Sequence, residues 1–191
     1  GETAVSVYGI LMFAEGFIQP LLYGMCDSLQ PAVGYNWGAQ KFSRVRAIEK
    51  CCFAAAAVVS LLSVFAIAFF PEQITGLFVA NPGNDILNMS IGALRLFSLT
   101  YVTRWFSFAT QSYMLAIEKP LPASLISLST ALLFPVVLVG ALWPLGLTGI
   151  WMNFAGTSLL AAILSAIILK KIWHELKKPD AEKTVAPEGN S

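Results

Sequence analysis

Charged residues are scarce in this sequence. Only 12% of its 191 residues are Asp, Glu, Lys or Arg, whereas 57% are hydrophobic. Soluble domains carry about 25% charged residues because their surfaces face water. The low charge therefore argues against an ordinary soluble domain and favours lipid as the surrounding solvent. The formal net charge of +1 gives no indication of nucleic-acid binding.

Residue types that commonly bind metals or perform catalysis are equally few. There is one histidine, His174, and the three cysteines, Cys26, Cys51 and Cys52, have neither metal-ligand spacing nor a disulfide framework. The sequence has no His-Glu-x-x-His motif, no recognisable Ser–His pair and no paired aspartates at membrane depth. We therefore expect a protein that is not an enzyme and has no cofactor, with the cysteines acting as small apolar packing residues.

Long apolar runs dominate the chain instead. A helix needs about 20 mainly apolar residues to cross the ~30 Å hydrocarbon layer, and about five segments here have that length. The sequence thus predicts an all-α fold, a polytopic membrane helix bundle over residues 1–176. The expected spans are 4–24 with an extension to 36, 47–70, 89–117, 121–143 and 147–172. Residues 177–191 are polar, and we expect them to form a disordered cytoplasmic tail.

The basic residues gather in three segments that connect or follow the spans. Ten of the 12 Lys and Arg residues lie there, namely Lys41, Arg44, Arg46, Lys50, Lys119, Lys170, Lys171, Lys177, Lys178 and Lys183. By the positive-inside rule these segments face the cytoplasm, so the N-terminus is expected outside. The first apolar run has no basic residue ahead of it and is not a signal peptide. We therefore expect an earlier span to precede residue 1.

One stretch after the first span is specific enough to indicate a family. It reads Gln-Pro-Ala-Val-Gly-Tyr-Asn-Trp-Gly-Ala from position 30 and is followed by Arg44-Val45. Its motif residues are Gln30, Pro31, Gly34, Tyr35, Asn36, Gly38 and Ala39. The stretch resembles the signature that follows the eighth helix of multidrug and toxin extrusion (MATE) transporters. Weaker similarities follow in register at Pro71-Glu72-Gln73-Ile74, Leu94-Arg95, Pro135 and Gly146-Leu147-Thr148-Gly149-Ile150-Trp151.

The resemblance extends over nearly all of the chain from Gly1 to Trp173. It implies that the spans correspond to helices eight to twelve of twelve, a partial C-lobe, with the N-lobe and the seventh helix outside this chain. It also implies alternating access between two lobes, driven by entry of the coupling ion Na+ or H+, that exports amphipathic organic cations. We expect a multi-pass protein of the bacterial cell membrane with a cytoplasmic C-terminus. Ser129 and Thr130 stand where many relatives carry an Arg-Gln pair.

Glu15 lies deep in the first span, about 16 Å from its start and close to the membrane midplane. A charge at this depth costs at least ~2.5 kcal/mol, so such residues usually face an interior cavity and have a function. At roughly 100° per residue, one stripe of this helix carries Tyr8, Met12, Glu15, Gln19, Tyr23, Cys26 and Gln30. We expect Glu15 to bind the coupling ion, a proton or a cationic substrate, with Gln19 beside it and Tyr8 and Tyr23 offering π-faces. The alternative is a hydrogen-bonded seam between helices in which Glu15 is neutral.

Arg104 lies near the middle of the third span, about 18 Å from either end and too deep for simple snorkelling. One face of that helix carries Thr100, Arg104, Ser107 and Gln111. Arg104 and Gln111 complete the candidate substrate- and ion-binding residues. Because Glu15 is the only acid at comparable depth, we predict a Glu15–Arg104 pair; the alternative is a counter-charge from the missing lobe.

Other polar residues within or beside the spans have simpler explanations. Arg95 sits nearer the outer surface, and snorkelling accounts for it. Asp27 lies beside the basic loop as a solvated or loop-pairing acid. Asn153 and Thr157, one turn apart, are expected to form a packing hydrogen bond.

A cation-coupled drug exporter is the favoured function, because Glu15 lies on an aromatic-lined stripe and the motif at Gln30–Ala39 matches that family. A lipid-linked oligosaccharide flippase of the same superfamily is an alternative, which Arg104 keeps open because it suits a more basic cavity. An inactive truncated chain is another, because the family's cavity forms between two lobes. The expected partners are the lipid bilayer, small amphipathic cations and the rest of the transporter, with no nucleic acid.

Overall fold

The computed structural model describes residues 2–79 and 83–177, except for the side chains of residues 173–176. In this described part the chain is helical and contains no strand. The elements are α1 (Glu2–Asp27), α2 (Gln30–Gly38), α3 (Phe42–Phe69), α4 (Pro71–Phe78), α5 (Asn84–Ala116), α6 (Pro120–Leu128), a π-helix (Ser129–Leu133), α7 (Phe134–Leu142), a 3-10 turn (Trp143–Leu145) and α8 (Gly146–Leu176).

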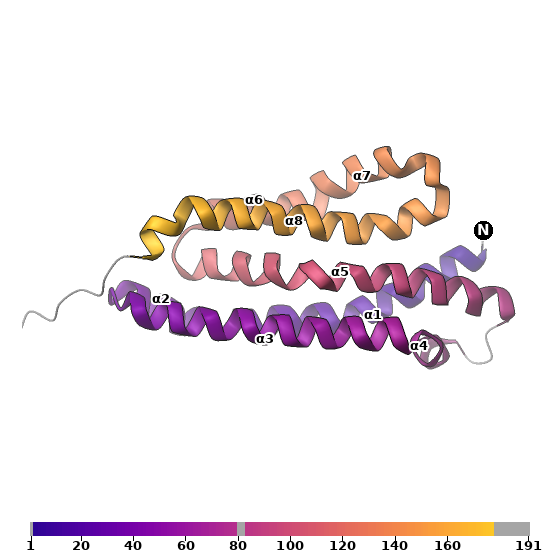
Figure 1. The fold of residues 1–191 in the computed structure, drawn as a ribbon, viewed down its shortest axis with the longest axis horizontal. Helices are drawn as coiled ribbons and strands as arrows, with labels where there is room; N and C mark the ends of the chain where they lie inside the picture. Colours follow the sequence, from indigo (N-terminus) through magenta and orange to yellow (C-terminus); the bar gives the residue numbers. More distant parts are fainter. Residues whose placement is uncertain (1, 80–82, 178–191) are drawn as a thin grey trace, which may run out of the picture.

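Four stretches of the described chain are long and apolar enough to cross a membrane. They are Glu2–Gly38, Phe42–Phe69, Asn84–Ala116 and Pro120–Ile172. The last contains a reversal at Gly146, whose φ of 55° favours glycine, so α7 and α8 run antiparallel (Figure 1). Two passes in that stretch and one in each of the others confirm the predicted membrane helix bundle. The predicted tail from residue 178 onward lies outside the described residues.

The α7–α8 hairpin closes tightly because glycine lines its inner side. A Cβ atom on Gly149 would lie 2.4 Å from the backbone oxygen of Leu142, and one on Gly156 would lie 2.9 Å from Leu138 Cδ1. A side chain at either position would push the two helices apart. Lipid provides no hydrophobic driving force for helix association, so membrane helices rely on close packing, which small residues at the contact allow.

Helix α5 occupies the centre of the bundle, between the layer of α1 and α3 and the layer of α6, α7 and α8 (Figure 1). The main core cluster joins Val7 and Leu11 of α1 to Phe97 and Tyr101 of α5. Hydroxyl side chains are also buried along α5, at Ser90, Ser98, Thr100, Ser107, Thr110 and Ser112. Their small size lets neighbouring helices pack closely on several sides of α5.

The outer surface of the bundle is strongly apolar. Exposed large hydrophobic side chains include Val58, Leu61, Leu62, Phe65, Leu121, Leu125 and Leu128. So many exposed large hydrophobic side chains suit hydrocarbon rather than water. The distribution therefore agrees with the membrane environment that the low charge predicted.

The family motif forms the short helix α2, which begins with Pro31 in its first turn. A Cβ on Gly34 would lie 3.3 Å from the backbone oxygen of Ala116 at the end of α5, so this glycine is a close-packing point. Gly38 of the same motif is not such a point, because a Cβ there would meet nothing within 4 Å. Asn36 donates from Nδ2 to the Ala32 oxygen at 2.8 Å, a contact within its own helix.

Candidate ion and substrate site

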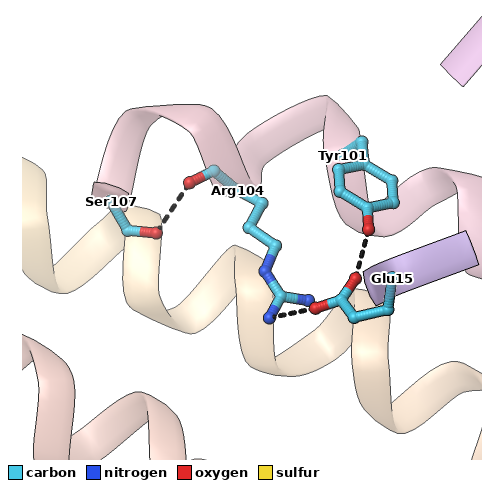
Figure 2. Close-up of polar contacts among 4 residues, drawn as sticks. All are labelled: Glu15, Tyr101, Arg104 and Ser107. Atoms are coloured by element: carbon cyan, nitrogen blue, oxygen red, sulfur yellow. Dashed lines mark hydrogen bonds and ion pairs between the residues drawn. The ribbon is translucent and has the colours of Figure 1, made fainter. Parts of the chain in front are cut away.

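Glu15 of α1 and Arg104 of α5 form an ion pair inside the bundle. Arg104 Nη2 lies 2.7 Å from Glu15 Oε1, and the two side chains are 15% and 12% exposed (Figure 2). The predicted pairing of these two residues is confirmed. Each charge is thereby neutralised at a depth where an unpaired charge is costly.

Tyr101 completes the coordination of Glu15. Its hydroxyl donates a hydrogen bond to Glu15 Oε2, the carboxylate oxygen that Arg104 does not bind (Figure 2). Tyr101 is fully buried, and its backbone oxygen accepts a 2.6 Å hydrogen bond from Ser60 Oγ of α3. The tyrosine is therefore fixed by two helices and holds the carboxylate in one orientation.

The residue that sequence analysis missed here is Tyr101. It precedes Arg104 by three positions on α5, and side chains three apart lie on the same helical face. That spacing was the available signal, but a buried tyrosine among apolar residues is also a common core side chain. Only the approach of α1 to this turn of α5 distinguishes the two roles.

Aromatic rings cover the other side of the guanidinium. Arg104 Cζ lies 5.3 Å from the ring centroid of Phe108, within the range of a cation–π contact. Tyr23 stacks on Phe108 with centroids 4.0 Å apart. Arg104 Nε is buried and has no hydrogen-bond partner within the described residues. One donor of Arg104 is thus satisfied by no described residue.

Two small cavities meet at Arg104. The first, of about 140 Å³, is lined by Gln19, Tyr23, Arg104, Ser107, Phe108, Gln111, Ile126, Ser127, Thr130 and Ala131. The second, of about 170 Å³, is lined by Arg104, Thr130, Pro135, Asn153, Phe154, Thr157 and Ser158. The structure therefore brings the predicted residues Gln19, Tyr23 and Gln111 to the same cavity as Arg104.

Thr130 reaches both cavities from the π-helix between α6 and α7. Pro135 follows this π-helix by two residues, and a proline removes one helical hydrogen bond and crowds the preceding turn. Single π-turns of this kind are frequent at functional sites.

The predicted packing hydrogen bond between Asn153 and Thr157 of α8 is present, because Thr157 Oγ1 donates to Asn153 Oδ1 at 3.1 Å. In addition, Asn153 Nδ2 lies 3.4 Å from the Pro135 oxygen.

Of the seven residues in the predicted α1 stripe, Gln19 and Tyr23 line one of these cavities, whereas Tyr8, Met12, Glu15, Cys26 and Gln30 line neither. Tyr8 is 42% exposed and its ring lies 6.5 Å from Trp151 and 6.2 Å from Phe154 between centroids. Cys26 is buried in another cluster, which includes Cys52 of α3. Tyr8 lies seven residues before Glu15 and Cys26 eleven residues after it, about 10 Å and 16 Å along α1, so each lies at another level of the bundle than the ion pair.

Gln30 joins α2 to α5 instead of lining a cavity. Its Nε2 donates to Asp27 Oδ1 at 2.8 Å and to Ser112 Oγ at 3.1 Å. Asp27 is exposed, in agreement with a solvated or loop-pairing acid. Arg95 is likewise exposed, as expected for a side chain that snorkels to the membrane surface.

The site consists of one carboxylate paired with one cation. Among the described residues, no group of three or more His, Cys, Asp or Glu side chains is placed to hold a metal ion. The site has instead one carboxylate whose two oxygens are held by a cation and a hydroxyl. Any cation at the Glu15 carboxylate competes there with Arg104, which also lines both cavities.

The family profile MatE matches residues 1–139. The chain belongs to the MatE family. Its relatives include the multidrug export protein MepA of Staphylococcus aureus strain MSSA476, 26% identical over 175 residues, which cover 89% of this chain and 38% of MepA. MepA of strain MRSA252 is 25% identical over the same coverage.

Solved MatE-type structures share the fold. An outward-facing multidrug resistance MATE family transporter of the MOP superfamily aligns with a TM-score of 0.83 at 21% identity, covering 94% of this chain and 40% of that one. An inward-facing structure aligns with a TM-score of 0.77 at 21% identity, covering 92% and 40%. This MatE chain therefore spans about two fifths of the length of the proteins it matches. The flippase alternative finds no support among these relatives, which are multidrug exporters.

Proposed function

We propose that this MatE chain forms part of the C-lobe of a multidrug exporter and carries its coupling centre at Glu15, Arg104 and Tyr101. The observation that carries the proposal is the 2.7 Å ion pair between Arg104 Nη2 and Glu15 Oε1, shielded inside a membrane bundle. A purely structural contact between helices can be made from neutral hydroxyls and amides, whereas a charged pair costs more free energy to place in lipid.

The coupling step in this proposal is an exchange of partners at Glu15. A proton or Na+ arriving at the carboxylate weakens its attraction to Arg104, and the guanidinium then moves toward the cavities. Entry of one charge through ~100 mV supplies ~2.3 kcal/mol, which is enough to shift a two-state equilibrium by a factor of about fifty. Alternating access of two lobes follows if the paired and unpaired forms favour different packing of α1 against α5.

Amphipathic organic cations are the proposed cargo. The aromatic faces of Tyr23 and Phe108 suit a cationic or planar group, and the amides of Gln19 and Gln111 can hydrogen-bond its polar atoms. The cavities in this chain are small, so we propose that the larger substrate space forms against the N-lobe and the seventh helix. The end of the bundle with α2 and the basic residues is proposed to face the cytoplasm of a bacterial cell.

The test is drug efflux by the natural full-length gene product in cells or everted vesicles. Glu15→Gln should abolish the response of efflux to an imposed proton or sodium gradient, because an amide cannot exchange a charge. The matched control is Glu72→Gln, at an exposed acid of α4 outside the site. Gradient-driven efflux that is unchanged in Glu15→Gln would remove this residue from the coupling role.

A further inference from the structure

A groove on the surface of the bundle shares no residue with the Glu15–Arg104 site. It has a volume of about 310 Å³ and lies between the start of α6 and the end of α8. Its walls are formed by Leu121, Pro122, Leu125, Ile168, Lys171 and Ile172. The exporter function proposed above does not use this groove.

The groove lies at one boundary of the membrane-spanning part of the chain. The last apolar stretch begins at Pro120 and ends at Ile172, and the groove is built from residues next to both of these ends. Leu125 and Ile168 lie one helical turn, about 6 Å, deeper than Leu121 and Ile172. The groove therefore extends from the level of the lipid headgroups into the hydrocarbon layer.

The α6 wall of the groove is apolar and open. Leu121 is 82% exposed and Leu125 is 51% exposed, whereas Ile168 and Ile172 on the α8 side are buried. No described residue covers the two leucine side chains to a greater extent than these values allow. An exposed apolar groove at this depth suits a hydrocarbon chain.

Lys171 is the one charged residue that lines the groove, and its side chain is exposed. Among the described residues, no acidic side chain lines the groove and none forms a salt bridge with Lys171. A lysine stem can lie along an apolar helix surface while its ammonium reaches the headgroup level. Basic pockets between membrane helices are typical binding sites of anionic lipid headgroups.

We propose that this groove binds an anionic phospholipid, with its phosphate at the Lys171 ammonium and one acyl chain along Leu121 and Leu125. A zwitterionic phospholipid also has a phosphate, but its cationic group finds no carboxylate in the groove. A free inorganic anion leaves the leucine side chains uncovered, and an apolar protein helix leaves Lys171 without an anion. The anionic phospholipid supplies both the hydrocarbon and the negative charge.

The experiment measures lipid binding to the purified full-length gene product by native mass spectrometry in detergent. Phosphatidylglycerol and phosphatidylcholine with identical acyl chains are compared, and glycerol phosphate without acyl chains is added as a competitor. We expect phosphatidylglycerol to bind roughly fivefold more tightly than phosphatidylcholine, the effect of one lysine beside an anionic headgroup. Equal affinities of the two lipids, or their displacement by an equal concentration of glycerol phosphate, would overturn the proposal.

Two neighbouring lysines test whether the preference belongs to the groove. Lys171→Gln should remove most of the fivefold preference for phosphatidylglycerol. Lys170→Gln is the matched control, because Lys170 is also exposed and carries the same charge but does not line the groove. Equal losses in the two variants would mean a diffuse attraction to the basic end of the bundle, which contradicts a site at Lys171.

Two exposed leucines of α6 test the acyl-chain contact. Leu121→Gln should weaken both phospholipids several-fold, because it places an amide on the apolar wall of the groove. Leu128→Gln is the control, since Leu128 is 63% exposed on the same helix and does not line the groove. Both side chains are on the surface, so neither change disturbs the core. Lipid affinities in Leu121→Gln that equal those of the control would contradict the proposal.

Discussion

Arg104 Nη2 of α5 contacts Glu15 Oε1 of α1 at 2.7 Å, and these two residues are 89 positions apart in the sequence. The pair links the first helix of the chain to the central helix of the bundle (Figure 1). Its strength should therefore be visible both in stability and in transport, which makes it the first target for mutation.

Glu15→Gln and Arg104→Gln should each destabilise the protein, by about 3–5 kcal/mol, because each leaves an uncompensated buried charge. The double variant should lose much less unfolding free energy than the two single losses added together, since no charge then remains unpaired. Unfolding of the purified protein in mild detergent by denaturant measures all three variants. Simple additivity of the two single effects would show that the residues do not depend on each other.

Tyr101→Phe should lower the free energy of unfolding by about 1–3 kcal/mol, because Glu15 Oε2 loses its hydrogen-bond donor while the ring and its packing remain. The rate of gradient-driven efflux should fall with it, since the carboxylate is then held by Arg104 alone. Tyr35→Phe is the control, because Tyr35 is exposed on α2. A Tyr101→Phe protein with the stability and efflux of the Tyr35→Phe control would argue against the positioning role.

Variants of Tyr23 and Tyr8 can distinguish two descriptions of the drug-binding surface: the cavity found in the structure and the stripe predicted on α1. Tyr23→Leu should weaken the binding of a cationic drug by several-fold, because the stack with Phe108 that faces Arg104 is lost. Tyr8→Leu should leave drug affinity nearly unchanged, since Tyr8 lines neither cavity and only packs behind Phe154 in the wall of the second. Fluorescent drug binding to both variants measures the difference, and equal losses would favour the simple helical stripe.

Gly149→Ala should destabilise the α7–α8 hairpin by about 1–3 kcal/mol, because the added Cβ meets the Leu142 backbone oxygen. Gly140→Ala in α7 is the control, since a Cβ there meets nothing within 4 Å and alanine favours the helix. Thermal unfolding of both variants is the measurement. A neutral Gly149→Ala would mean that the hairpin opens easily at this point.

The helices were predictable from the sequence because a run of about 20 apolar residues can cross a bilayer only if its backbone groups bond to one another, as they do in a helix. The Glu15–Arg104 pair was predictable for a related reason, since only one acid and one base lie at the same depth. The contact of Tyr101 with Glu15 and the position of Thr130 beside both cavities were not predictable, because each depends on which turn of one helix packs against another. Cys26 shares the helical face of Glu15 but lies eleven residues further along α1, about 16 Å, so it belongs to another level of the bundle.

Arg104 forms part of the wall of both small cavities, and this sharing limits how they can be filled. The guanidinium has five N–H donors, and Nη2 already contacts Glu15, so acceptors in the two cavities draw on one positive charge. An anionic guest in one cavity should therefore weaken the binding of a like guest in the other, and titration of a small anionic probe should show a second, weaker binding step.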